Sequence, residues 1–215
     1  MKQEKTIIIK FAGLFGLLVP FIVFIIIGVS IYYSSGFSWT NNWLSELAGQ
    51  AGEEPIWAAR GVSSLIFNIG IIVAGLLGIV FTIAIWKIKI LNSKLGLLGK
   101  SFLTVDMVAL LAIGIFPLTT DIYHDIVSFL YFLLVALSLV TLGIEFKRKS
   151  ETKLGLILII LGIISFSSFP LFFVPQPWGS NAIIEMVPIT SLSISAVIFG
   201  YNILKGKFDF IENKE

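Results

Sequence analysis

The sequence contains no cysteine and only one histidine, His124. Without cysteine the chain has no disulfide, no thiol nucleophile and no thiolate ligand for zinc. A single histidine is a weak basis for a metal site, so we expect neither a metal nor another cofactor. The G-x-S-x-G, H-E-x-x-H, phosphate-loop and EF-hand patterns are absent as well. The sequence alone therefore leaves open whether the protein is an enzyme.

Charged residues are also scarce, at 13% of the chain, whereas 57% of the residues are hydrophobic and the mean hydropathy is +0.99. This composition exceeds what the core of a soluble domain of 215 residues requires. Apolar runs of roughly 20 residues cross a bilayer as helices. The sequence predicts one all-α domain, residues 1–215, with six transmembrane helices at about 11–31, 56–86, 101–117, 124–146, 154–174 and 182–204. The second helix is expected to start near residue 56, because proline is tolerated in the first turn of a helix and Pro55 fits that position.

All but one of the 15 Lys and Arg residues fall in four short patches that pairs of apolar runs separate. Short basic loops stay on the cytoplasmic side during insertion. We therefore expect a multi-pass protein of the cell membrane with both termini in the cytoplasm and one long outer loop between helices 1 and 2. Arg60 is the exception and lies in that outer loop. Insertion and anionic lipids account for the basic patches, so we expect no nucleic-acid partner.

The long loop, residues 34–60, contains Trp39, Trp43 and Trp57. Indole rings partition to the membrane interface, which indicates that the loop lies there. Trp43, Leu44 and Leu47 fit one face of a short helix, and we expect Asn41 or Asn42 to cap it.

Polar residues gather at the start of the fourth helix, where Asp121 is followed by His124 and Asp125. Residues three and four apart share a helix face. With Glu46 or Glu185 from neighbouring outer segments, this group fits binding of a cation or a headgroup, or acid–base chemistry. The alternative is structural: Asp121 caps the helix, Asp125 complements the helix dipole, and the histidine sits at the interface.

Asp106 is an acid inside the third apolar run. An ionised Asp at a helix centre costs roughly 2.5 to 3.5 kcal/mol on insertion scales, so we expect it to face the interior of the bundle. Tyr201 and Asn202 match its depth best. A proton or ion relay and a structural hydrogen-bonded acid both remain open.

Several short motifs resemble, in order along the chain, those of the small multi-pass membrane proteins grouped as domain of unknown function 998. Residues 42–48 (NWLSELA) are similar to the N-x-x-S-D-L-G signature of an outer loop, with Glu46 and Ala48 in place of Asp and Gly. The other similar segments are residues 67–70 with 74–76, 114–117, His124 and Ser128. The resemblance implies that Ser45, Glu46, Asn68, Pro117 and His124 form one outward-facing group.

We therefore predict an outward-facing polar vestibule that binds a lipid headgroup or another small ligand. Its candidate residues are Ser45, Glu46, Asn68, Asp121, His124, Asp125 and Glu185. Three alternatives remain: a non-catalytic subunit of a larger membrane complex, a small transporter, and a lipid-modifying enzyme. The expected partners are membrane lipids, with other membrane proteins or further copies of the chain as possibilities.

The topology is testable because a chain without cysteine gives no labelling background. We expect Ser35→Cys, Thr120→Cys and Ser180→Cys to react with an impermeant thiol reagent added to intact cells. Ser93→Cys and Ser150→Cys should react only after the membrane is permeabilised. The reverse pattern would mean that the orientation is inverted.

Overall fold

The computed structural model describes residues 2–50, 53, 59–177, 179 and 181–211. In this part of the chain there are six long helices. They are α1 (Lys2–Tyr33), α2 (Val62–Trp86), α3 (Lys94–Ile115), α4 (Ile122–Arg148), α5 (Thr152–Ser168) and α6 (Ala182–Leu204). Each is long and apolar enough to cross a membrane, α5 together with the 3-10 turn η4 (Phe169–Phe173) that extends it. The predicted six-helix membrane bundle is confirmed.

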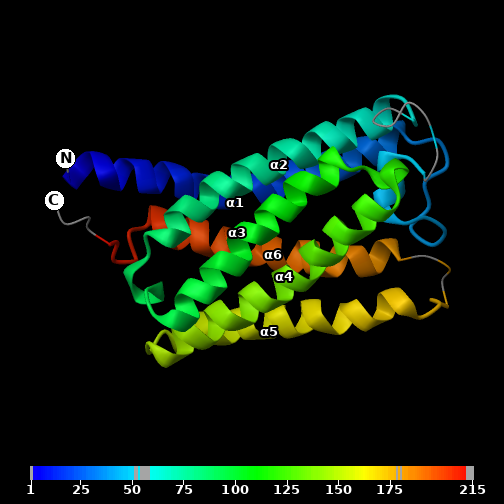
Figure 1. The fold of residues 1–215 in the computed structure, drawn as a ribbon. Helices are drawn as coiled ribbons and strands as arrows, with labels where there is room; N and C mark the ends of the chain where they lie inside the picture. The colour runs from blue at the N-terminus through cyan, green and yellow to red at the C-terminus, as the bar shows by residue number, and fades with distance from the viewer. Residues whose placement is uncertain (1, 51–52, 54–58, 178, 180, 212–215) are drawn as a thin grey trace.

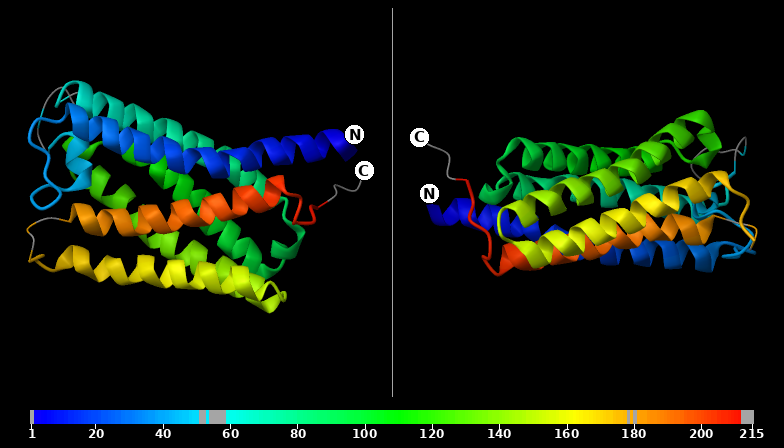
Figure 2. Two further views of the ribbon diagram at one scale, coloured as in Figure 1. Left: turned by 180° about the vertical axis from the view of Figure 1, so that it is seen from behind. Right: turned by 90° about the horizontal axis from the view of Figure 1, so that it is seen from below.

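Consecutive helices pack side by side from α1 to α5, and α6 returns to lie against α1 (Figure 1). α5 packs mainly on α4 and α6 (Figure 2). α4 and α6 themselves touch only slightly. The bundle is thus a ring of five helices, with α5 covering the seam between α4 and α6 from outside.

Apart from Arg60, the Lys and Arg residues that the structure describes share one end of the bundle. We call this the terminal end, because α1 begins and α6 ends there (Figure 1). The opposite end holds the segments 34–61, 116–121 and 174–181, and we call it the loop end. Arg60 lies at the loop end, apart from the other basic residues, as predicted. That the terminal end faces the cytoplasm stays a prediction from the charge pattern. Of the positions chosen for thiol labelling, Ser180 lies outside the described residues.

Glycines bring neighbouring helices into backbone contact. A Cβ atom on Gly75 of α2 would lie 2.5 Å from the backbone nitrogen of Leu111 in α3, and one on Gly155 of α5 would lie 2.6 Å from the carbonyl oxygen of Gly143 in α4. Such separations leave no room for a side chain. Small residues at these crossings let membrane helices approach closely, where water-driven hydrophobic association is absent.

The start of the second helix differs from the prediction. α2 begins at Val62, six residues after the expected start at 56, and Ala59–Gly61 form a turn. Gly61 has φ +61°, a left-handed conformation that ends helical continuity. Pro55 lies outside the described residues. The third helix also ends early, at Ile115, so that Pro117 follows the helix and precedes a short 3-10 turn.

The long loop contains a short helix as predicted, but Trp43 does not share the buried face of Leu44 and Leu47. Leu44–Ala48 form the 3-10 helix η1, and Leu44 and Leu47 are 3% and 0% exposed. These leucines pack into the mouth of the bundle, because α2 and α6 offer apolar surface there. Trp39 and Trp43 remain about half exposed at the surface, and Trp57 lies outside the described residues.

Candidate functional site

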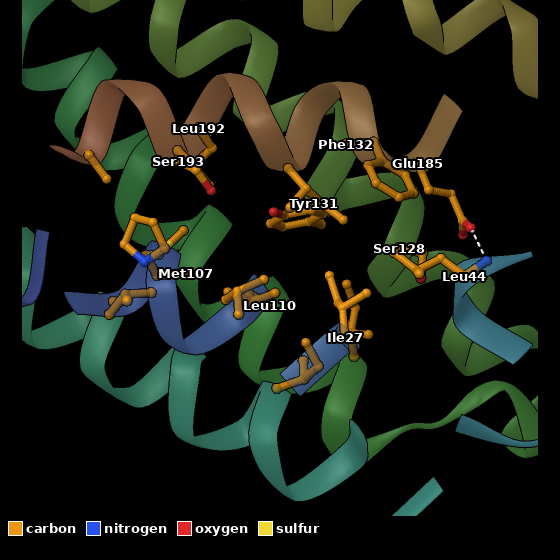
Figure 3. A pocket seen from close by; sticks show the side chains of 18 of the residues that line it. Ile27, Leu44, Met107, Leu110, Ser128, Tyr131, Phe132, Glu185, Leu192 and Ser193 are labelled. Atoms are coloured by element: carbon orange, nitrogen blue, oxygen red, sulfur yellow. Dashed lines mark hydrogen bonds between the residues drawn. The ribbon is translucent and has the colours of Figure 1, made fainter. Parts of the chain in front are cut away.

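An apolar cavity of about 80 Å³ runs inside the ring of helices (Figure 3). Side chains from α1, α2, α3, α4 and α6 line it, among them Val23, Phe81, Met107, Leu110 and Leu192. Empty cavities lined by such groups stay dry. The cavity has room for a narrow apolar segment, because one water molecule needs only about 10–15 Å³ of volume measured in this way.

A wider groove of about 520 Å³ opens at the loop end, between η1, α4, η4 and α6. Aromatic rings form much of its wall. Trp43 stacks on Phe172 with ring centroids 6.5 Å apart, and Phe172 stacks on Phe132 at 4.9 Å. Phe129, Phe169 and Phe173 extend this wall. Such rings offer an apolar face and attract cations weakly.

The groove and the interior cavity meet at five residues that line both: Ser45, His124, Ser128, Phe132 and Glu185. We call these five residues the neck. Four of them are polar, whereas the cavity below is apolar. The neck therefore marks a change from polar to apolar surroundings along one path.

Glu185 holds the loop onto the bundle. It lies in the first turn of α6, is 5% exposed, and its carboxylate accepts a hydrogen bond from the backbone N–H of Leu44 (Figure 3). Ser45 donates to it as well, from its backbone and its side chain. These donors are at the start of η1, where backbone N–H groups lack partners within the helix. The carboxylate thus caps a loop helix from a helix distant in sequence.

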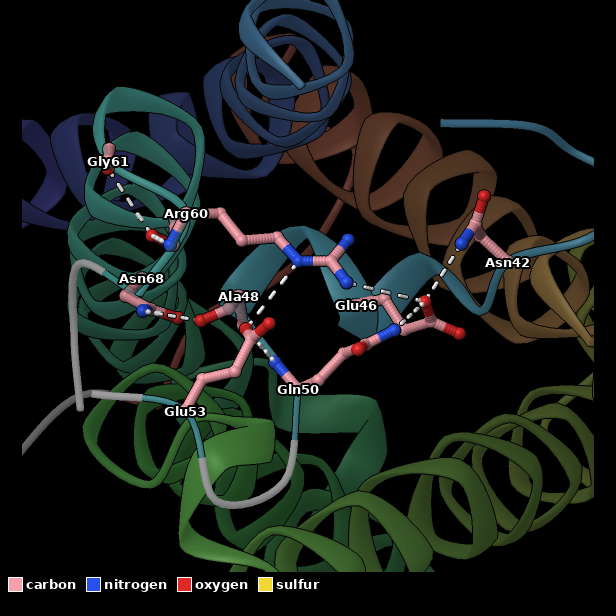
Figure 4. Close-up of polar contacts among 9 residues, drawn as sticks. Asn42, Glu46, Ala48, Gln50, Glu53, Arg60, Gly61 and Asn68 are labelled. Atoms are coloured by element: carbon pink, nitrogen blue, oxygen red, sulfur yellow. Dashed lines mark hydrogen bonds and ion pairs between the residues drawn. The ribbon is translucent and has the colours of Figure 1, made fainter. Parts of the chain in front are cut away.

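Glu46 organises the loop itself (Figure 4). Its carboxylate accepts hydrogen bonds from Asn42 Nδ2 at 2.8 Å, Gln50 Nε2 at 3.0 Å and the backbone N–H of Trp43 at 3.1 Å. The expected cap by Asn41 or Asn42 is therefore wrong, since Asn42 bonds to Glu46 and the N-cap residue is Trp43. The signal missed was a carboxylate three residues after the cap position.

Arg60 ties the same network to the end of the loop. Its guanidinium lies 3.9 Å from the Glu46 carboxylate and 3.6 Å from that of Glu53, which also accepts the backbone N–H of Gln50. Burial raises the pKa of Glu46, but the hydrogen bonds from Trp43, Asn42 and Gln50 and the charge of Arg60 outweigh it. The pKa of Glu46 consequently lies below its ordinary value, and the group is a carboxylate at neutral pH.

His124 is 3% exposed, and both of its ring nitrogens have partners. Nδ1 lies 2.9 Å from the Phe116 carbonyl oxygen, and Nε2 lies 3.2 Å from Ser128 Oγ. A carbonyl only accepts, so Nδ1 carries the hydrogen. In neutral imidazole Nε2 is then an acceptor facing the Ser128 hydroxyl. The arrangement orients the ring so that Nε2 faces the Ser128 hydroxyl within the neck.

The structure brings most of the predicted site residues together. Ser45, Glu46, His124, Asp125 and Glu185 line the groove. Glu46 and His124 share this groove, but each is bonded to other partners, so direct pairing between them is not the arrangement observed.

Asn68 and Asp121 do not line the groove. Asn68 is buried in α2, where its Nδ2 donates to the Ala48 carbonyl oxygen at 3.4 Å and supports the loop from below. Asp121 precedes α4 with φ +53° and makes no side-chain cap, so the capping interpretation is wrong.

Asp106 is fully buried in α3, and neither carboxyl oxygen has a hydrogen-bond partner among the described residues. Tyr131 on α4 is near enough for an electrostatic interaction. The expected pairing with Tyr201 or Asn202 is wrong, because α3 packs between α2 and α4 whereas α6 packs against α1 and α5. Asp106 is also not among the residues that line the interior cavity.

No group of three His, Asp or Glu residues with metal-binding geometry occurs in the described part of the chain. Sequence reasoning missed the aromatic wall from η4 and the role of Gln50. The run Phe169–Phe173, which contains Pro170, was the available signal, because proline ends a helix and lets the following rings turn toward a neighbour.

Comparison with known proteins identifies the family. A family model described as "Protein of unknown function (DUF998)" matches residues 17–202, which is most of the chain. The chain belongs to this family, in agreement with the motifs in its loops and helices. Searches of curated proteins and of solved structures found no match.

The Glu46 network predicts a specific dependence on pH. Because its pKa is lowered by folding, Glu46 contributes stability that is present above its ordinary pKa and is lost as the pH falls through the lowered value. We expect Glu46→Gln to lower the unfolding free energy at pH 7 by about 1–3 kcal/mol. The difference from the wild type should shrink below about pH 4.

Thermal unfolding in detergent at both pH values measures this effect. Asp121→Asn is the matched control, since it removes one charge at the same end without breaking a side-chain cap. Equal destabilisation by both variants at pH 7, or a Glu46→Gln effect that is independent of pH, would contradict the assignment.

Proposed function

We propose that this protein binds one amphipathic membrane lipid at the loop end. The polar group of the lipid occupies the groove beside the neck, and its chain enters the interior cavity. The observation that carries the proposal is that the same five neck residues line both spaces. A ligand that follows this path meets aromatic and polar surfaces first and apolar ones afterwards, which is the order of chemistry along a lipid.

The neck offers a limited set of groups to the polar part of such a ligand. Glu185 and Glu46 already bond to the loop, so they shape the site, and the Glu46 carboxylate gives it a negative charge. Ser128 Oγ, His124 Nε2 and the exposed Asp125 carboxylate are the groups that face the groove for direct contacts. The stacked rings of Trp43 and Phe172 supply an apolar shelf for the linker between headgroup and chain.

Filling the interior cavity tests this function. Ser193 lines the cavity, and its hydroxyl points into it (Figure 3). In Ser193→Phe the ring displaces about three methylene groups of the bound chain at about 0.8 kcal/mol each, which lowers affinity more than tenfold. We expect the wild type to retain one class of lipid through purification, measured by mass spectrometry, and the variant to lose it.

Ser167→Phe is the matched control, because Ser167 is exposed on α5 and lines neither space. It should retain lipid like the wild type. A folded Ser193→Phe protein that retains the same lipid in the same amount would refute binding in the cavity.

A second candidate function is cleavage of a lipid ester, which the Ser128–His124 geometry favours. With Nε2 3.2 Å from Oγ, the imidazole can take the hydroxyl proton as Oγ attacks a carbonyl carbon. The ester C–O bond then breaks, the alcohol leaves with that proton, and water later hydrolyses the acylated serine. The Phe116 carbonyl orients the ring at Nδ1, the position where catalytic triads have a carboxylate.

A fluorophosphonate probe distinguishes this candidate from binding alone. If Ser128 is a nucleophile, intact-mass spectrometry should show one adduct on the wild type, mapped to Ser128. Ser128→Ala and His124→Gln should each abolish the adduct. An unlabelled, folded wild-type protein would exclude the hydrolase and leave the binding function in place.

A further inference from the structure

The terminal end carries a second groove, remote from the neck. It has a volume of about 590 Å³ and lies where α3 begins and α4 ends. Its lining residues are Ser93, Lys94, Leu95, Leu98, Glu145, Arg148 and Lys149. None of them takes part in the groove or the cavity described above.

The charges in this groove are unusual because they do not pair with one another. Lys94, Arg148 and Lys149 are exposed, and none of them is in an ion pair among the residues that the structure describes. Glu145 is only 1% exposed, and its Oε1 atom has no hydrogen-bond partner in the same part of the chain. Burying an acceptor without a partner is costly, and more so for a charged group. The groove thus contains three available cations and one unsatisfied buried acceptor.

The spacing along α4 separates these groups by depth. Arg148 and Lys149 follow Glu145 by three and four residues, so they share its helix face and lie about 4.5 to 6 Å nearer the terminal end. Opposite them, α3 begins at Lys94 with Ser93 as its cap, and the positive end of its dipole faces the groove. The rim therefore suits an anion, and the site one turn deeper suits a hydrogen-bond donor.

We propose that this groove binds the headgroup of an anionic phospholipid. The phosphate lies against Lys94, Arg148 and Lys149, and an O–H group of the headgroup donates to Glu145. Leu95 and Leu98 continue the groove toward the apolar part of α3, and Leu98 is 45% exposed. These two leucines contact the first part of the acyl chains of the lipid. A soluble phosphate compound has no acyl chains and so lacks this contact.

This proposal specifies which headgroups fit. Phosphatidylglycerol has one negative charge and two hydroxyl donors. Phosphatidylmethanol has the same charge without a donor, and phosphatidylcholine has neither a net charge nor a donor. A hydrogen bond to a carboxylate is stronger than one between neutral groups, so we expect phosphatidylglycerol to bind at least about tenfold more tightly than phosphatidylmethanol. Phosphatidylcholine should bind most weakly of the three.

Native mass spectrometry of the detergent-purified full chain, titrated with each lipid, measures these affinities. In Glu145→Gln the preference for phosphatidylglycerol over phosphatidylmethanol should fall to about threefold or less. Arg148→Gln combined with Lys149→Gln should weaken both anionic lipids and keep the preference. Lys207→Gln removes one charge at the same end outside this groove and should leave the order of affinities unchanged.

The comparison of lipids on the wild type stands even if a variant fails to fold. Equal affinity for phosphatidylglycerol and phosphatidylmethanol would overturn the role of Glu145, and equal affinity for phosphatidylcholine would overturn the anion site. Displacement of bound lipid by millimolar glycerol 3-phosphate would show that the groove recognises a soluble phosphate ester rather than a membrane lipid. These outcomes are independent of the Ser193→Phe test at the loop end.

Discussion

The contact between the Glu185 carboxylate and the start of η1 determines the architecture of the loop end. It joins α6 to a loop helix 141 residues earlier in the chain and holds that helix in the mouth of the bundle. Leu44 and Leu47 then close the apolar interior from above. From its tryptophans alone the loop was predicted to lie at the membrane interface. The groove and the neck exist because the loop is drawn inward.

Two separate polar networks lie near this contact. Glu46 bonds to Asn42 and Gln50 and lies near Arg60, so its hydrogen-bonding capacity is largely used within the loop. His124 and Ser128 on α4 bond to each other and to one backbone carbonyl, which leaves them directed toward the groove. The polar groups that bond within the loop are thus separate from the pair on α4 that lines the groove, although both sets lie close together at the loop end. The neck is where they meet the apolar cavity.

Local sequence properties predicted much of this arrangement. The length of the apolar runs gave six helices, and the positions of Glu46, His124 and Glu185 relative to those runs placed all three at the same end of the bundle. Contacts between distant segments were not predictable in this way. The bond from Leu44 to Glu185, the isolation of Asp106 from Tyr201, and the position of α5 outside the ring all depend on the lateral order of the helices. Hydropathy and charge give depth in the membrane but carry no information on that order.

The central claim is that groove, neck and interior cavity form one site for one lipid. A single-chain lipid with a photoreactive diazirine at the middle of its chain tests this most directly, with the cross-linked peptides identified by mass spectrometry. If the lipid chain occupies the cavity, we expect saturable labelling of cavity-lining residues such as Leu110 and Leu192, abolished by excess unlabelled lipid. Labelling confined to membrane-exposed positions such as Ile160 and Ile163 of α5, and not reduced by competitor, would contradict it.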